Sequence, residues 1–213
     1  MTPEIVVGRP SEGGFDTGLL HALYRFRHRV FRQKLGWDVS SIGGMEFDFY
    51  DEIDPMHVAA CLPGRQVIAS SRLLPSVGPY MLKDVFPQLL RGESAPCASD
   101  VWEVSRFAVE PPDRNARVQA TFNGATLALL DTGFQVAREH GVREFVMATS
   151  VAVERMLVGA GLHMERFGDG VATRIGKVLS VACRVEVSES QMERMYARVA
   201  QRYEEQQQMA GAA

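Results

Sequence analysis

The chain has 213 residues, a formal net charge of −3 at pH 7, 46% hydrophobic residues and 23% charged residues. This composition is ordinary for a globular protein that buries a full core, and the slight acidic excess argues against a nucleic-acid-binding protein, which usually carries a basic excess. No apolar run approaches the roughly 18 residues of a membrane-spanning helix, and the N-terminus lacks the layout of a signal peptide. The three cysteines are too widely spaced for a disulfide or zinc framework. We therefore expect a cytoplasmic protein without a bound metal.

The first half of the chain predicts one helix followed by two paired strands. After a short strand at 5–7, a helix is expected over 18–34, capped by Asp16 or Thr17 and ended by Gly36. Residues 38–54 show no clear period and are interpreted as a loop beside a site. Strands at 57–62 and 66–74 are joined by a Pro-Gly turn signal, which predicts a hairpin.

The second half predicts a strand–helix–strand unit and a polar C-terminal helix. Residues 75–98 are irregular apart from a short helix near 81–90. The elements expected after them are strands at 102–109, 144–149, 171–174 and 180–187, and helices at 117–140, 153–159 and 188–208. No repeat or internal linker is visible, so we expect one domain spanning residues 1–213.

The strand at 101–109 is unusual because it carries a carboxylate and a guanidinium three residues apart, Glu103 and Arg106. Period-2 alternation predicts two faces: Trp102, Val104, Arg106 and Ala108 on one, and Glu103, Ser105, Phe107 and Val109 on the other. Charges in so apolar a strand are costly unless they are paired or used. A salt-bridged edge strand and a functional site are both compatible with this segment alone.

Further charged and aromatic residues precede this strand in a specific order. RFRHRVFRQKLGW contains Arg27, Phe31 and Trp37, GMEFDFYDEID contains Asp48 and Asp51, and ASSRLLPS contains Arg72. With Glu103 and Arg106, this ordered set resembles the acyl-homoserine-lactone synthases, the LuxI-type autoinducer synthases of bacterial quorum sensing. The resemblance runs from about residue 20 to residue 109 and continues beyond only as a pattern of strands and helices.

The resemblance implies a fold, a reaction and a set of substrates. The implied fold is a three-layer α/β/α sandwich with a mixed, splayed central sheet, like that of the GNAT acyltransferases. The implied reaction transfers an acyl group from acyl-coenzyme A or an acyl-carrier protein to the amine of S-adenosylmethionine, and then closes the lactone with release of methylthioadenosine. Both reactants are substrates, so no cofactor is expected.

The resemblance also assigns roles to the charged residues. Glu103 is the candidate base for the amine, and its structural alternative is a partner for Arg106 or Arg27. The three arginines, Arg27, Arg72 and Arg106, are expected to hold the methionyl carboxylate or to stabilise the thioester oxyanion. Asp48 and Asp51 are expected to face the sulfonium or the ammonium, or to lock the arginines in place.

Aromatic residues and the second half complete the expected site. Phe31 and Trp37 are expected to contact S-adenosylmethionine, with core packing as the alternative for each. Met81, Leu82 and Phe86 either border the same cleft or pack in the core. The expected acyl pocket comprises Met147, Thr149, Ser150, Val153, Met156 and Leu157, although Thr149 or Ser150 is equally suited to cap the helix that follows.

The donor and two other functions remain open at this point. Val158-Gly159 stands where the resemblance leads us to expect a basic residue, and this favours an acyl-coenzyme A donor over an acidic carrier protein, although Arg155, Arg166 and Arg174 offer positive charge nearby. The alternatives are an N-acyltransferase of the same fold with another amine acceptor, and a ligand sensor without catalytic activity.

Overall fold

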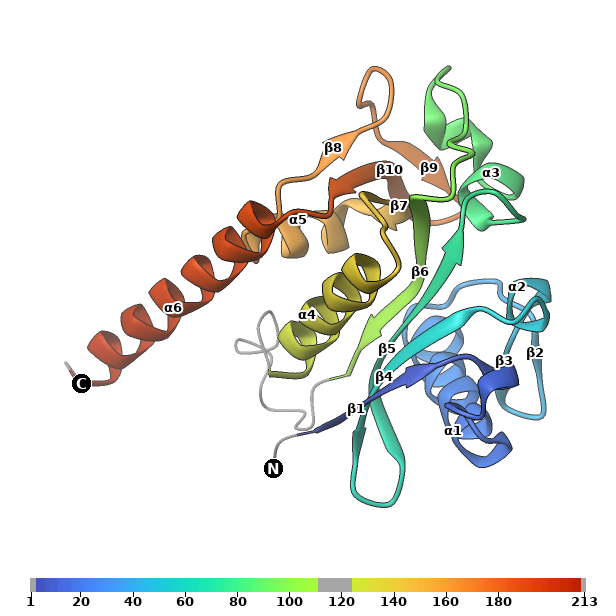
Figure 1. Ribbon diagram of the computed structural model, residues 1–213, viewed down its shortest axis with the longest axis horizontal. Helices are drawn as coiled ribbons and strands as arrows, with labels where there is room; N and C mark the ends of the chain where they lie inside the picture. The colour runs from blue at the N-terminus through green and yellow to red at the C-terminus, as the bar shows by residue number, and fades with distance from the viewer. Residues whose placement is uncertain (1–2, 111–123, 212–213) are drawn as a thin grey trace.

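The computed structural model describes residues 3–110 and 124–211. Its centre is an eight-stranded sheet with the order β1-β4-β5-β6-β7-β10-β8, in which β9 also pairs with β10 (Figure 1). The strands are β1 (Glu4–Gly8), β4 (Met56–Leu62), β5 (Gln66–Pro75), β6 (Val101–Val109), β7 (Glu144–Ser150), β8 (Glu165–Arg166), β9 (Thr173–Ile175) and β10 (Val178–Glu186). β6 and β7 run parallel, and the other described neighbours in this sheet are antiparallel.

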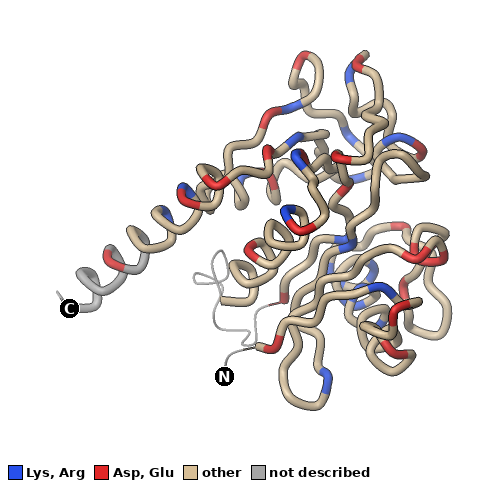
Figure 2. Tube along the Cα trace, viewed as in Figure 1, with Lys and Arg blue, Asp and Glu red and all other residues tan. Residues whose placement is uncertain are grey.

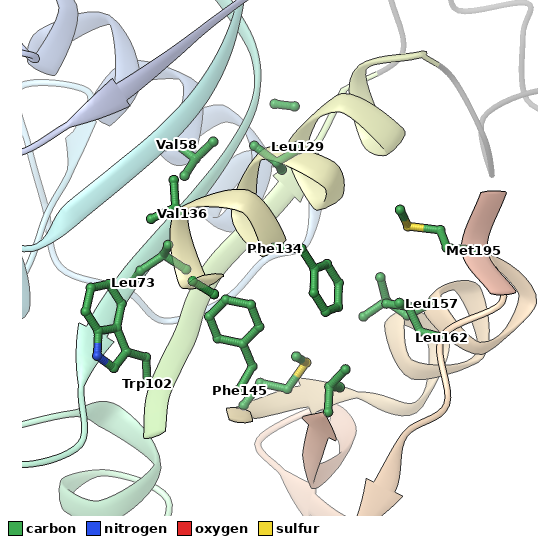
Figure 3. Close-up of a cluster of buried hydrophobic side chains, with 14 of the residues drawn as sticks. Val58, Leu73, Trp102, Leu129, Phe134, Val136, Phe145, Leu157, Leu162 and Met195 are labelled. Carbon is green, nitrogen blue, oxygen red and sulfur yellow. The ribbon is translucent and has the colours of Figure 1, made fainter. Parts of the chain in front are cut away.

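One face of the sheet is covered by α4 (Gly124–Glu139), α5 (Val151–Gly159) and the start of α6 (Glu189–Gly211). Their apolar side chains meet the inward residues of the strands in the largest hydrophobic core of the described chain (Figure 3). The labelled members of this core are Val58, Leu73, Trp102, Leu129, Phe134, Val136, Phe145, Leu157, Leu162 and Met195. This core forms because the strands alternate and the helices present one apolar stripe each.

The other face is covered by α1 (Thr17–Arg27), its continuation η2 (His28–Lys34), the small elements β2 (Ser41–Ile42), β3 (Met45–Glu46) and α2 (Phe49–Glu52), and further along by α3 (Met81–Asp84) and η3 (Pro87–Leu90). As predicted, Asp16 caps α1 by accepting a hydrogen bond from the backbone N–H of Leu19. The layers are therefore helix, sheet, helix, and the predicted α/β/α sandwich is confirmed.

The predicted splay of the sheet lies between β6 and β7. The two strands pair only at their beginnings, where Val101, Trp102 and Glu103 stand opposite Glu144, Phe145 and Val146. β6 continues for six further residues alongside β5, whereas β7 continues alongside β10. The sheet consequently opens immediately beyond Glu103.

The predicted alternation along β6 is wrong from Arg106 to Val109. Ser70 pairs with Ala108 but Arg72 pairs with Ser105, so β6 carries an extra residue in a β-bulge at this point. Arg106 occupies this bulge with a left-handed φ of 51°. The bulge reverses the alternation beyond it. Phe107 and Val109 consequently pack with Trp102 in the α4-side core, while Arg106 shares the opposite face with Glu103.

Two other predictions need correction. The helix expected over 18–34 changes at Arg27 into a π-helix, in which the N–H of Leu35 binds the carbonyl of Val30. The segment expected to be a loop contains the β2–β3 hairpin and α2. The N-terminal part of the helix predicted over 117–140 lies outside the described residues, and α4 agrees with the rest. None of the helices among the described residues has the length and apolar character needed to cross a membrane.

Candidate functional site

Three arginines and three carboxylates gather where α1, the segment from β3 to α2, and the strands β5 and β6 meet. Positive and negative positions lie side by side around α1 and α2 (Figure 2). The members of this cluster, called here the ion cluster, are Arg27, Arg72, Arg106, Glu46, Asp48 and Asp51. Their formal charges cancel, which is a requirement for burying so many ionised groups together.

Arg27 is almost fully enclosed, with 1% of its surface exposed. Its two terminal nitrogens donate to the two carboxylate oxygens of Asp51 at 2.7 and 2.9 Å, and its Nε donates to Glu46. Burial raises the pKa of Asp51, but Arg27 and Arg72 outweigh this effect and hold that pKa well below its usual range. Because every nitrogen of Arg27 already has a carboxylate partner, Arg27 is committed to holding the cluster together.

Glu46 is a member of the cluster that the sequence analysis missed. It is fully buried on β3 and accepts hydrogen bonds from Arg27 and from Nε of Arg106. The signal that would have found it is Gly43-Gly44, a two-residue hairpin turn in which both residues have positive φ. Recognising that hairpin would have placed Glu46 on a strand facing α1.

Asp48 and Asp51 each serve two purposes. They form a capping box on α2, in which Asp48 accepts from the N–H of Tyr50 and Asp51 accepts from the N–H of Asp48. The same carboxylates bind the arginines, since Asp48 accepts from Arg72 at 2.6 Å and from Arg106 at 2.6 Å. Of the alternatives in the sequence analysis, locking the arginines is the arrangement that the structure shows.

Arg72 and Arg106 differ from Arg27 because one terminal nitrogen of each guanidinium lies against a weak acceptor. Nη2 of Arg72 and Nη1 of Arg106 lie 3.2 and 3.1 Å from the thioether sulfur of Met81. Arg72 also donates to Ser105 on β6, and Arg106 lies over the ring of Phe31 at 5.7 Å. The Met81 sulfur thus brings these two guanidiniums together beside β6.

Glu103 lies on the same face, at the point where β6 and β7 separate. It is fully buried, and its two oxygens accept hydrogen bonds from the backbone N–H groups of Met81 and Leu82 at 3.0 and 2.6 Å. Burial raises the pKa of Glu103, although these two amides and the charges of Arg72 and Arg106 lower it in part. No ion pair with Arg27 or Arg106 is present, so the expected structural alternative for Glu103 is wrong.

A buried histidine lies behind the ion cluster. His57 on β4 stands opposite Arg72 on β5, and its ring packs against Phe15 with centroids 5.3 Å apart. Burial lowers the pKa of His57 to about 3, so the imidazole is neutral at pH 7.

Phe31 and Trp37 form an aromatic pair at the edge of the cluster. Their ring centroids are 5.1 Å apart with an interplanar angle of 23°. Phe31 is buried while Trp37 is half-buried and lines an open hollow of about 300 Å³ with Arg32, Gly36 and Asp38. Phe31 therefore packs in the core, as its alternative role predicted, and its ring also lies beneath the Arg106 guanidinium.

The residues expected to form an acyl pocket lie on the β7 side of the opening and on α5. Met147 and Leu157 are members of the α4-side core, and Val153 and Met156 pack against it half-buried. Ser150 caps α5 by accepting a hydrogen bond from the N–H of Val153, which is the alternative role predicted for it. Thr149 is half-buried on β7 opposite Val181. Within the described residues no group of three or more His, Cys, Asp or Glu is arranged to hold a metal ion.

Comparison with known proteins gives consistent results. Residues 15–195 match the model of a family described as autoinducer synthase. The chain is 37% identical over 186 residues to an acyl-homoserine-lactone synthase of Pseudomonas aeruginosa, covering 86% of this chain and 89% of that protein.

Solved structures give the same picture. The crystal structure of the AHL synthase LasI superposes with a TM-score of 0.80 at 35% identity, covering 92% of this chain and 95% of that chain. TofI, in a ternary complex with an inhibitor and MTA, gives 0.74 at 28% identity over 92% of this chain and 96% of that chain.

Proposed function

This chain belongs to the autoinducer synthase family, and on that premise we propose how its residues make an acyl-homoserine lactone from S-adenosylmethionine and an acyl thioester. The observation that carries the assignment of roles is the shared face of Glu103, Arg72 and Arg106. A buried carboxylate and two guanidiniums with incompletely used donors meet there, at the mouth of the splayed sheet.

The first step is acyl transfer to the amine. The ammonium of S-adenosylmethionine gives one proton to Glu103, and the resulting amine attacks the thioester carbon. The carbon–sulfur bond of the thioester then breaks, and the departing thiolate takes the second proton from the nitrogen and leaves as the thiol. Glu103 suits this role because burial raises its pKa and makes it a stronger base than an exposed carboxylate. Its oxygens each accept one amide hydrogen bond, which leaves lone pairs for the substrate.

The second step is closure of the lactone. A methionyl carboxylate oxygen attacks the γ-carbon, and the bond from that carbon to the sulfonium sulfur breaks to release methylthioadenosine. The sulfonium is a good leaving group, so the protein's contribution is orientation. We assign that task to Arg72 and Arg106, held in place by Asp48, while Arg27, Glu46 and Asp51 hold the cluster. That the related TofI binds MTA supports this product.

The aromatic pair and the splay provide the two binding regions. Arg106 lies over the ring of Phe31 and Trp37 stacks on that ring, so a sulfonium bound beside this pair gains a cation–π contact. The acyl chain enters between β6 and β7 towards Met147, Thr149 and Met156, beside the α4-side core.

An acyl-coenzyme A donor remains our prediction. Of the three arginines considered for docking a carrier protein, Arg166 is bound bidentately by Glu154 at 2.6 Å, so its charge is already neutralised. Val158 is exposed on α5 where a basic residue would have helped. The measurement is kcat/KM for one acyl group on each carrier, and a value tenfold higher with the carrier protein would contradict the prediction.

The test of the function uses purified protein with S-adenosylmethionine and panels of both acyl donors. Release of methylthioadenosine together with an acyl-homoserine lactone, identified by mass spectrometry, is the expected result. An acylated amine without methylthioadenosine would favour an N-acyltransferase with another acceptor, and binding without any product would favour a sensor. We further propose that the protein acts in the cytoplasm, where both substrates are made, and that activity survives a metal chelator because no cofactor is needed.

A further inference from the structure

Met81 occupies a position that its side chain is poorly suited to fill. Its sulfur lies within 3.2 Å of Nη2 of Arg72 and within 3.1 Å of Nη1 of Arg106. Guanidinium N–H groups form their strongest hydrogen bonds with carboxylates, whereas a thioether sulfur is a weak acceptor. Met81 is 8% exposed and Arg72 is 0% exposed, so water does not readily replace the Met81 sulfur as the acceptor.

The other donors of these arginines are fully used. Nε and Nη2 of Arg106 donate to Glu46 and Asp48, and Nε and Nη1 of Arg72 donate to Ser105 and Asp48. The two nitrogens that contact the sulfur are the ones that could gain a stronger acceptor. Nη2 of Arg72 has one further contact, a long one of 3.4 Å to Asp48. The convergence of these two nitrogens on one atom defines the place of an incoming anionic oxygen pair.

Met81 also links this place to Glu103, because its backbone N–H donates to the Glu103 carboxylate at 3.0 Å. The Glu103 carboxylate therefore lies on one side of Met81, and the guanidinium donors of Arg72 and Arg106 lie on the other side. An α-amino acid has the matching arrangement, with an ammonium and a carboxylate on one carbon.

We propose that the Met81 sulfur occupies the carboxylate position of S-adenosylmethionine in the free protein, and that the methionyl carboxylate displaces it from Arg72 and Arg106 while the ammonium faces Glu103. This inference rests on the proposed function. Met81 is then a positioning residue that sets the affinity for the carboxylate, since binding must first break two weak hydrogen bonds to sulfur.

The experiment measures the dissociation constants of S-adenosylmethionine and of decarboxylated S-adenosylmethionine by calorimetry, without an acyl donor. Met81→Leu removes the sulfur acceptor and should tighten binding of S-adenosylmethionine about three- to tenfold. Met81→Gln supplies a stronger competing acceptor and should weaken binding by a similar factor. Binding of the decarboxylated ligand should stay within twofold in both variants, because that ligand does not displace the sulfur.

The control is Met195→Leu, which exchanges a fully buried methionine of the α4-side core and should change neither constant. Equal shifts for both ligands, or no shift for S-adenosylmethionine in either Met81 variant, would overturn the inference. An effect confined to the KM of the acyl thioester would also overturn it, since the anionic oxygen would then belong to the thioester. A parent protein that makes lactone while the Met81 variants bind unchanged would leave the proposed function intact.

Discussion

Replacing Glu103 with Gln tests the proposed base with little change of shape. Glutamine keeps one acceptor oxygen for the amides of Met81 and Leu82 but accepts no proton from the substrate. Loss of a general base typically costs about 10²–10⁴-fold in rate. We expect kcat to fall by this factor while the dissociation constant of S-adenosylmethionine changes much less.

Two opposing contributions keep the expected loss of stability small. Glu103→Gln loses one charge-assisted hydrogen bond, worth about 1.5–3 kcal/mol, because its NH2 group cannot accept from the second backbone N–H. It also removes the cost of burying an ionised carboxylate, the same cost that raises the pKa of Glu103. Since 1 kcal/mol shifts Tm by about 2–4 °C in a chain of this size, the Tm of the variant should stay within several degrees of the parent's.

The pH dependence of activity and of stability provides an independent test of Glu103. Because burial raises the pKa of Glu103 above its ordinary value of 4.5, the acid limb of kcat/KM should lie above pH 4.5, with activity falling as Glu103 gains a proton. Stability follows the opposite direction: the contribution of a protonated Glu103 is present below the unfolded pKa and is lost as pH rises through the folded pKa. The Gln variant should lose both dependences.

The assay is steady-state release of methylthioadenosine, with circular dichroism and thermal unfolding of the same preparations. Glu93→Gln is the control, because Glu93, like Glu103, accepts from a backbone N–H, that of Gly168. Glu93 lies outside the ion cluster and is paired with Arg184. Turnover of Glu103→Gln within fivefold of the parent would refute the role of base and leave Glu103 as a cap on the segment at Met81.

Two further predictions concern the buried charges. Arg27→Met should destabilise the fold by about 3–5 kcal/mol in urea unfolding, because Glu46 and Asp51 lose their buried partner, and adding Asp51→Asn should recover part of the loss; an unchanged unfolding midpoint would contradict this. Because burial lowers the pKa of His57 to about 3, the unfolded chain binds a proton that the fold excludes, so stability should fall as pH drops from about 6.5, approaching about 1.4 kcal/mol per pH unit. His57→Phe should flatten that slope while the exposed His21→Gln should keep it, and an equal slope in both variants would show that other groups cause it.

Local signals in the sequence predicted most of the fold, but not the geometry of the site. The cap at Asp16 and the apolar strands follow from short-range chemistry and are confirmed. The position of Arg106 was mispredicted because a bulge depends on pairing with β5, which alternation along one strand does not contain. Glu46 was missed because its burial depends on Arg27 and Arg106 meeting it from two distant segments.

The mutual pairing within the ion cluster restricts how this protein changes over evolutionary time. Neutralising any one of Arg27, Glu46 or Asp51 leaves the buried cluster with one unbalanced charge, so a tolerated change requires a second, compensating substitution in the same lineage. Residues that line the opening beyond Glu103 can change without a compensating substitution, since β6 and β7 share no pairing there and side chains such as Met156 are only half-buried. Drift should therefore accumulate at the acyl side one residue at a time, so that descendants of one ancestor diverge in the signal they send while the chemistry that makes it stays the same.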